Sequence, residues 1–415
     1  MKKKTLSLLL AALLAALPLS GCGRTAPVQA ADLLSGIEPS EEAAQPMTGA
    51  DKAAAAGFAV RLLQQYAAEG GGENILLSPL SALYALGMTM SGARGRTLEQ
   101  MTAALGLDEQ GMERLCGYAA ALSADGETAL ANSVWMRDDK RLRVEPDFLQ
   151  KAVDCYGAGL YKAAFDEQTV RDINEWVSEK TGGRIDEIVD EIPPDALLYL
   201  VNALAFDAEW ETAYLAHQVR EGSFTAADGS RSTVQFMHSE ERLYLQDGQA
   251  RGFVKPYAGG RYAFAALLPG EGISPEEYIA SLTGEKLSAL LGGAEERTVN
   301  AVLPKFESGS RLELGRALQA MGMTDAFSDE EADFTGMAAW SAGNIFISRV
   351  LHHTAIGVDE KGTRAGAATA VEAIKESATS EEIQTVCLDR PFVYLIIDRE
   401  QALPLFVGVL NSPER

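Results

Sequence analysis

Residues 358–377 read VDEKGTRAGAATAVEAIKES, a charged turn around Gly362 followed by small residues and a short polar end. Alanine is the strongest helix former, so local propensity favours a helix or a plain loop. An alternation with a period of two indicates a strand instead. The uncharged face of that strand would consist of Thr363, Ala365, Ala367, Thr369, Val371 and Ala373. Such a segment could enter a sheet without burying an ion.

The composition is that of a globular protein. The chain has 415 residues, of which 47% are hydrophobic and 23% charged, which suits one large domain or two. Its net charge of −23 argues against a nucleic acid or an anionic membrane surface as partner, because both attract basic patches. No basic run follows residue 4.

The N-terminal residues are typical of a targeting segment. Three lysines at 2–4 precede the apolar run 6–17, which is too short for a comfortable membrane span. The sequence LSGC at 19–22 resembles the lipobox of bacterial lipoproteins, whose cysteine is lipidated and becomes the mature N-terminus. We therefore expect a lipoprotein signal peptide over 1–22, export, and a lipid anchor at Cys22 on the outer side of the cell membrane, facing the periplasm or the exterior. A soluble secreted protein is the alternative.

The segment that follows the signal peptide is rich in Ala, Pro, Glu and Gly and shows no sustained periodicity. It predicts a flexible tether over 23–48, with the folded domain over 49–415. With Cys22 lipidated, an odd number of cysteines remains: Cys116, Cys155 and Cys387. This count implies no disulfide framework.

Signatures of metal sites and enzymes are missing. The cysteines form no CxxC, and the four histidines form no HExxH, so we expect no metal or other cofactor. No GxSxG, P-loop or GxGxxG occurs either, and a hydrolase is a distant alternative.

The periodicity mixes helices and strands without a regular βαβ rhythm, which predicts the α+β class. Helices are predicted at 52–65, 78–91, 97–105, 146–155, 170–181, 275–291 and 312–321. Strands are predicted at 128–137, at 197–206, at several short segments between 224 and 268, and at 391–397 and 405–410. The last two are expected to form an antiparallel pair in the core, so that truncation there would be severe.

Five motifs, in order, resemble those of serpins, the serine protease inhibitor family, over residues 51–412. They are 74–81 (NILLSPLS), 200–203 (LVNA) with Trp210, 303–306 (LPKF), 358–363 (VDEKGT) with the small residues after it, and 389–392 (DRPF) with 404–408 (PLFVG). The resemblance implies three β-sheets, eight or nine helices and an exposed reactive loop, in a metastable protein. It also implies that the chain is a monomeric inhibitor, not an enzyme.

In serpins a target serine protease cuts the loop and is trapped as a covalent acyl-enzyme while the loop inserts as a new strand into the large sheet. The resemblance thus favours the strand interpretation of residues 358–377. A non-inhibitory binding protein of the same fold is the alternative, but such proteins typically lose the small hinge residues. This chain retains Ala365, Ala367 and Ala368 beside the hinge residues Glu360, Gly362 and Thr363.

The cleaved bond follows by counting. In serpins it lies about seventeen residues beyond the hinge glutamate, which places it between Glu376 and Ser377, with Lys375 as the alternative. Insertion of the fourteen residues from Thr363 to Glu376 would carry an attached protease about 46 Å. Two departures from the family are Arg364, where an acidic residue is usual, and Gly366, where alanine is usual. We expect both to be tolerated, because Arg364 belongs to the outward face and Gly366 weakens the strand only slightly.

The resemblance also carries over residues that support opening of the sheet. Ser78, Asn202 and His352 would form a polar cluster beneath it, Trp210 would mark the region where insertion begins, and Lys305 would pair with Glu360. Each position has a simpler interpretation. Ser78 could cap a helix, Trp210 could be core, and Lys305 could be a solvated charge.

Overall fold

The computed structural model describes residues 28–40, 45–69, 72–123, 126–364 and 383–413. Over these ranges the chain forms three β-sheets and nine α-helices, which confirms the predicted α+β class. None of the described helices is both long and apolar enough to cross a membrane.

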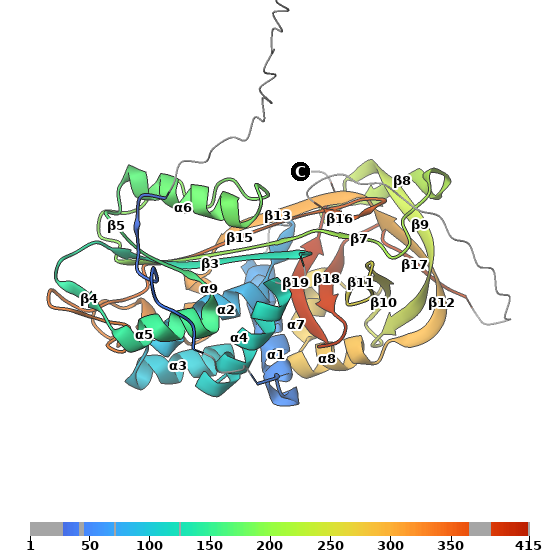
Figure 1. Cartoon of the computed structure of the whole chain (residues 1–415). Helices are drawn as coiled ribbons and strands as arrows, with labels where there is room; N and C mark the ends of the chain where they lie inside the picture. The colour runs from blue at the N-terminus through green and yellow to red at the C-terminus, as the bar shows by residue number, and fades with distance from the viewer. Residues whose placement is uncertain (1–27, 41–44, 70–71, 124–125, 365–382, 414–415) are drawn as a thin grey trace, which may run out of the picture.

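The nine described helices lie mostly on one side of the molecule, with α6 on the opposite side (Figure 1). They are α1 (Gly49–Glu69), α2 (Pro79–Ser91), α3 (Gly95–Leu105), α4 (Glu109–Ser123), α5 (Pro146–Lys151), α6 (Glu167–Lys180), α7 (Pro275–Ser281), α8 (Gly284–Gly292) and α9 (Gly315–Ala320). A π-helical turn, η1 (Ala152–Tyr156), continues α5. The 3-10 turns are η2 (Ala216–Gln218) and η3 (Asp325–Phe327).

The large sheet has the order β1-β5-β3-β6-β15-β16-β7, and β13 pairs with β15 as well. Its strands are β1 (Ala31–Asp32), β5 (Gly159–Ala163), β3 (Thr128–Arg137), β6 (Leu198–Phe206), β15 (Arg349–Val358), β16 (Gly362–Arg364), β7 (Ala208–Glu209) and β13 (Phe306–Glu313). Strand β6 is buried along its whole length, as its near-continuous apolar sequence, interrupted by Asn202, predicts for a strand covered on both faces. It runs antiparallel to β3 and parallel to β15.

Helix α6 lies on one face of the large sheet, and helices α2 to α5 lie on the other (Figure 1). Ile173 and Trp176 of α6 belong to a separate apolar cluster that includes Trp135 of β3 and Tyr199 of β6. The opposite face is part of the main core, to which α2 contributes an almost completely buried helix. The sheet is therefore held between two packed layers.

The second sheet has the order β17-β12-β9-β10-β11-β18-β19-β2, with β8 paired to β9. Its strands are β17 (Gln384–Cys387), β12 (Glu295–Pro304), β9 (Arg231–Gln246), β10 (Ala250–Pro256), β11 (Tyr262–Pro269), β18 (Phe392–Asp398), β19 (Leu403–Leu410), β2 (Ile75–Leu77) and β8 (Val219–Thr225). Every residue of β18 and β19 is buried, which confirms the predicted antiparallel core pair. A third, two-stranded sheet joins β14 (Ala338–Trp340) to β4 (Leu142–Val144).

Several elements differ from the sequence-based prediction. The helix predicted over 312–321 begins at Gly315, because residues 306–313 form β13 beside β15. The helix predicted over 275–291 is two helices, separated where Thr283 caps the second. Helix α4 was not predicted at all.

Residues 28–40 belong to the folded part and not to the flexible tether expected over 23–48. Ala31 and Asp32 pair with β5 at the edge of the large sheet. The backbone N–H of Ala30 donates to Asp172 of α6 at 2.8 Å, and that of Ser40 donates to Asp154 at 2.6 Å. An edge strand offers unpaired backbone groups, and this segment satisfies those of β5.

Candidate functional site

The hinge of the predicted loop is already part of the large sheet. Thr363 pairs with Val358 of β15 on one side and with Ala208 of β7 on the other, both antiparallel. Pairing between β15 and β6 ends three residues earlier along β15, where Ala355 pairs with Ala205. Strand β16 therefore occupies the position where β15 extends beyond β6, between β15 and β7 (Figure 1).

Thr363 points into the interior of the protein. Its side chain is fully buried, and its Oγ1 lies 2.5 Å from the hydroxyl of Tyr257. This hydrogen bond satisfies a polar group that would otherwise be costly to bury. Thr363, the first residue of the face that is expected to insert, is thus buried with its hydroxyl group hydrogen-bonded.

Gly362 stands in the charged turn noted in the sequence, where a glycine would ordinarily be expected to permit a left-handed backbone. Its φ is not positive. A Cβ at this position would lie 2.1 Å from the carbonyl oxygen of Ala208 and 2.8 Å from Cα of Glu209. The absent side chain lets β16 approach β7 closely enough to pair. The turn is instead stabilised by the Asp359 carboxylate, which accepts from the backbone N–H groups of Lys361 at 2.7 Å and Gly362 at 3.1 Å.

Trp210 holds the turn that precedes β16. Its indole Nε1 donates to the carbonyl of Asp359 at 2.8 Å, and its backbone N–H donates to the carbonyl of Lys361 at 2.8 Å. The indole stacks on Tyr257, with ring centroids 4.5 Å apart and planes 8° from parallel. The same two aromatic residues therefore fix both the turn and the inward side chain of Thr363.

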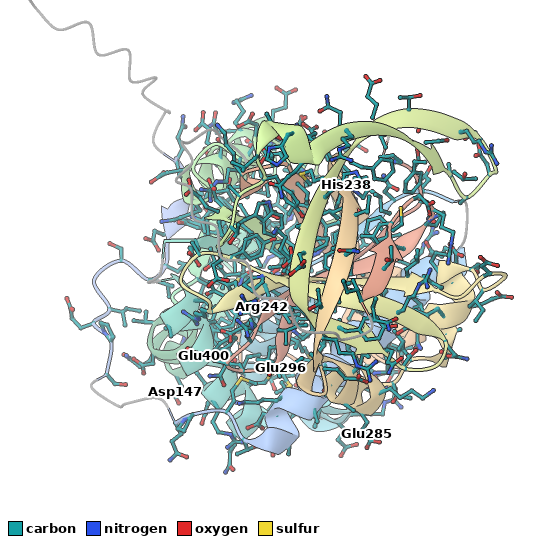
Figure 2. The ribbon with its side chains drawn as sticks, turned by 90° about the vertical axis from the view of Figure 1, so that its right-hand side faces the viewer. Asp147, His238, Arg242, Glu285, Glu296 and Glu400 are labelled. Atoms are coloured by element: carbon teal, nitrogen blue, oxygen red, sulfur yellow. The ribbon has the colours of Figure 1, made fainter. Side chains whose placement is uncertain are left out.

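A buried ion pair lies behind Trp210. Lys255 Nζ is 2.8 Å from Glu241 Oε1, and both side chains are less than a tenth exposed. The ammonium also lies 5.3 Å from the Trp210 ring centroid and 4.4 Å from that of Tyr214, within cation–π range. Arg242, the next residue of β9, is exposed, as is expected where successive side chains point to opposite faces (Figure 2).

Glu360 and Lys305 form an ion pair at the outer end of this region. Burial opposes ionisation of Glu360, but its hydrogen bond to Lys305 and the charges of Lys305 and Lys361 outweigh that effect and hold its pKa below the usual value. Lys305 directly follows β12, and its backbone N–H donates to Gln235 at 2.8 Å. The pair joins the start of the hinge to the second sheet.

A buried polar row crosses three strands of the large sheet. In register, Asn202 of β6 stands between Asn132 of β3 and His352 of β15. His352 Nδ1 is 2.5 Å from Asn202 Oδ1, and Asn202 Nδ2 donates to Asn132 Oδ1 at 2.5 Å. The backbone N–H of Ser78 donates to His352 Nε2 at 3.0 Å. Because Nε2 accepts, the proton of the neutral ring lies on Nδ1 and is donated to Asn202.

Two members of this row were not among the candidates chosen from the sequence. Ser81 Oγ donates to Asn202 Oδ1 at 2.9 Å, and Asn132 Oδ1 accepts from Asn202 Nδ2. Ser81 lies within the quoted motif 74–81, so the sequence held a signal for it. Asn132 is brought in by the register of β3 with β6, which no local pattern shows.

Burial strongly affects the histidine of this row. Desolvation, together with the neighbouring His353, lowers the pKa of His352 from 6.5 to about 3. The imidazole is therefore neutral near neutral pH, as its acceptor and donor roles require. Ser78 also caps α2, since its Oγ accepts from the backbone N–H of Ser81 at 3.4 Å.

The remaining sequence candidates lie outside the described residues. These are the hinge alanines Ala365, Ala367 and Ala368, the bond residues Lys375, Glu376 and Ser377, and the lipidation residue Cys22.

The first residues of the predicted reactive loop are already paired in the large sheet as β16. This arrangement is that of a protein whose loop is a candidate for a further strand of the same sheet. A family model described as Serpin (serine protease inhibitor) matches residues 53–413. The chain belongs to the serpin family. Serpins are mostly protease inhibitors rather than catalysts.

Similar proteins agree with this assignment. Leukocyte elastase inhibitor of Bos taurus is 31% identical over 374 residues, which cover 86% of this chain and 97% of that protein. The crystal structure of a thermophilic serpin, tengpin, in the native state is 42% identical, with a TM-score of 0.87 over 93% of this chain and all of that chain. The latent state of tengpin gives a TM-score of 0.78 over 89% of this chain and all of that chain. The described fold is thus more similar to the native state than to the latent state.

Proposed function

We propose that this protein is a metastable suicide-type inhibitor of serine proteases. A target protease cleaves the loop and remains attached as an acyl-enzyme while the loop inserts between β6 and β15. The observation that carries the proposal is β16, whose residues already pair antiparallel to β15 with Thr363 buried. The inserted strand would be an extension of an element that exists in the uncleaved protein.

The existing register predicts how this extension would fit. Continued along β15, the pairing of Thr363 with Val358 would place Ala365 opposite Ile356, Ala367 opposite Thr354 and Thr369 opposite His352. Directly opposed residues share a face of the sheet. The small inward side chains would then meet the buried residues of β15, and the hydroxyl of Thr369 would meet the polar row.

Insertion requires β6 and β15 to separate. Seven residue pairs join them, from Tyr199 with Arg349 to Ala205 with Ala355, and the His352–Asn202 hydrogen bond lies within this stretch. The present pairing is parallel, whereas the new strand would be antiparallel to both neighbours. Antiparallel pairing is slightly more stable per residue. Insertion would therefore replace one ladder with two, which supports a downhill transition after cleavage.

Cleavage is proposed between Glu376 and Ser377, with Lys375 as the alternative residue before the bond. A glutamate at that position selects a glutamate-specific protease, and a lysine selects a trypsin-like one. The sequences Ala373-Ile374 and Ala378-Thr379 would suit an elastase-like enzyme instead. The mass of the peptide released by each protease identifies the bond and the target class together.

The decisive experiment is incubation with active proteases of these classes, followed by denaturing electrophoresis. The proposal predicts an SDS-resistant band of inhibitor plus protease that is absent when the catalytic serine of the protease is replaced. Simple cleavage without such a band, across all the classes, would favour a non-inhibitory serpin-fold binding protein. Cleavage should also raise the unfolding temperature, since insertion releases stored strain.

We also propose that the protein is exported, anchored by lipid at Cys22 on the outer side of the membrane, and monomeric. The LSGC sequence at 19–22 supports the anchor. Metabolic labelling with palmitate should mark the wild-type chain and not Cys22→Ala, which should also leave the membrane fraction. Light scattering after gel filtration tests the monomer, and a dimer mass would contradict it.

A further inference from the structure

Two of the three cysteines of the folded domain lie side by side. Cys116 is in the middle of α4, and Cys155 is in η1, the turn that continues α5; these elements pack together (Figure 1). The two side chains are close enough for each thiol to shift the pKa of the other. The hydroxyl of Tyr84 donates to the backbone carbonyl of Cys155 at 2.9 Å and lies 3.4 Å from that of Cys116. One side chain thus holds both cysteine backbones.

From this arrangement we infer that Cys116 and Cys155 form a redox-active dithiol, which closes to an internal disulfide on reaction with a small-molecule disulfide. Both residues are free cysteines in the structure. Thirty-eight residues of sequence separate them, including all of β3, so nothing in their local spacing indicates the pair.

The two thiols differ in access, which assigns their roles. Cys116 is 3% exposed, whereas Cys155 is only half-buried. The hydrogen bond from Cys116 lowers the pKa of Cys155, whereas burial raises that of Cys116. The thiolate is the nucleophile in disulfide exchange. Cys155 is therefore the attacking group, and Cys116 is the group that resolves.

Neighbouring side chains also link the two elements that carry the cysteines. Lys151 and Glu113 form an ion pair at 2.9 Å between α5 and α4, one turn from the cysteines. The Tyr156 ring packs edge-on against Tyr84, the residue that contacts both cysteine backbones. Cys155 also lies within a π-helical turn, a backbone irregularity that is frequent at functional sites.

The exchange balances in two steps. The Cys155 thiolate attacks one sulfur of the external disulfide, forming a mixed disulfide and releasing one thiolate, which takes up the proton lost by Cys155. Cys116 then loses its proton and attacks the Cys155 sulfur of the mixed disulfide, releasing the second thiolate. This second thiolate takes up the proton lost by Cys116. The protein loses two protons and two electrons in all, and the external disulfide is reduced to two thiols. The new bond ties α4 to the turn that leads into β5.

The test is incubation of the full-length chain with glutathione disulfide, followed by intact mass measurement and peptide mapping. We expect the loss of two hydrogens and a cross-linked peptide pair containing Cys116 and Cys155, together with a higher unfolding temperature. In Cys116→Ser we expect a stable glutathione adduct on Cys155. In Cys155→Ser we expect no adduct on the buried Cys116.

Cys387→Ser is the matched control. Cys387 is also half-buried, and burial raises its pKa to about 11. This variant should form the cross-link like the wild type. The inference is overturned if the wild type forms no cross-link, or if Cys116→Ser gains no adduct at Cys155. Cys155→Ala is to be used beside Cys155→Ser, so that a folding defect of one variant does not decide the result.

Discussion

His352 and Asn202 face each other across β15 and β6, with Nδ1 of the ring 2.5 Å from the amide oxygen. This hydrogen bond joins the two strands that have to separate for a third to enter. Both side chains are almost completely buried, so the bond has no access to water in the closed sheet. Nδ1 is the donor because Nε2 accepts from the Ser78 N–H, and the ring can accept at Nε2 only while it is neutral.

Acid should weaken the protein through His352. The folded protein holds the pKa of His352 at about 3, whereas the unfolded chain has the ordinary value of 6.5. Between these values the unfolded chain binds the extra proton, so the free energy of unfolding falls as the pH falls, by about 1.4 kcal/mol per pH unit at most. Above pH 6.5 this contribution is constant. Urea unfolding across the range measures the slope, which His352→Gln should reduce and the exposed His217→Gln should not.

A charge on the inward face of the hinge should turn the inhibitor into a substrate. Thr363→Arg places a guanidinium where the Thr363 hydroxyl contacts Tyr257, in a fully buried position. An unpaired charge is too costly to keep at this buried position, so β16 should leave the sheet. The strand that insertion would extend is then lost, and the attached protease should complete hydrolysis before it is trapped. The measured quantity is the number of inhibitor molecules consumed per protease inactivated, which should rise well above one. Glu372→Arg, on the predicted outward face, should leave it unchanged; equal effects would refute the face assignment.

Gly362→Ala should expel β16 from the sheet. The added Cβ would lie 2.1 Å from a backbone oxygen of β7, which neither strand can relieve without losing its pairing. We expect a loss of roughly 1–3 kcal/mol, in line with overpacking of a core. Faster hydrogen exchange at the Thr363 amide would report the lost pairing. Gly292→Ala, where a Cβ meets open space, is the control. Unchanged exchange in Gly362→Ala would show that the close approach is not what requires glycine.

The hinge ion pair should contribute little to stability. The Lys305 and Glu360 side chains are 27% and 37% exposed, so water and salt screen the pair. A double-mutant cycle with Lys305→Ala and Glu360→Gln should give a coupling of about 0.2–1 kcal/mol. A coupling of several kcal/mol would mean that the pair is effectively desolvated. The cycle compares all four proteins by denaturant unfolding at one ionic strength.

Sequence periodicity is sufficient to predict the bounds of elements that are buried on both faces or that begin with a clear helix cap. Strand β6 and helix α2 begin and end close to the predicted residues, because the near-continuous apolar run of the first and the Ser78-Pro79 start of the second are local signals. Helix α4 was missed, since Gly111 and Gly117 lower its intrinsic helix propensity. Its helical form depends on packing against α2, which a local window does not contain.

In the candidate site, too, local sequence signals identify residues, whereas the contacts between them depend on the fold. The motifs located Asn202, His352 and Trp210, but the contacts among these residues depend on strand register. Asn132 joins the polar row because β3 pairs with β6 at that level. Cys116 and Cys155 meet because α4 and η1 return to the same side of the sheet. Gly362 was selected correctly as a special position, but the reason is the neighbouring strand, which lies far away in the sequence.

The buried pair of Lys255 and Glu241 gives the sharpest prediction on stability. Lys255→Met removes the cation and leaves a carboxylate that is less than a tenth exposed. Loss of one partner of such a pair costs about 3–5 kcal/mol, because the remaining charge stays buried and unpaired. The double variant Lys255→Met with Glu241→Gln should recover much of this loss, since no net charge is then buried. Arg242→Met, at an exposed position of the same strand, is the control and should change the free energy of unfolding by less than about 0.5 kcal/mol. Denaturant unfolding of the four proteins measures these differences. If the double variant is as unstable as Lys255→Met alone, the cost comes from lost cation–π and packing contacts with Trp210 and Tyr214, and not from an uncompensated carboxylate.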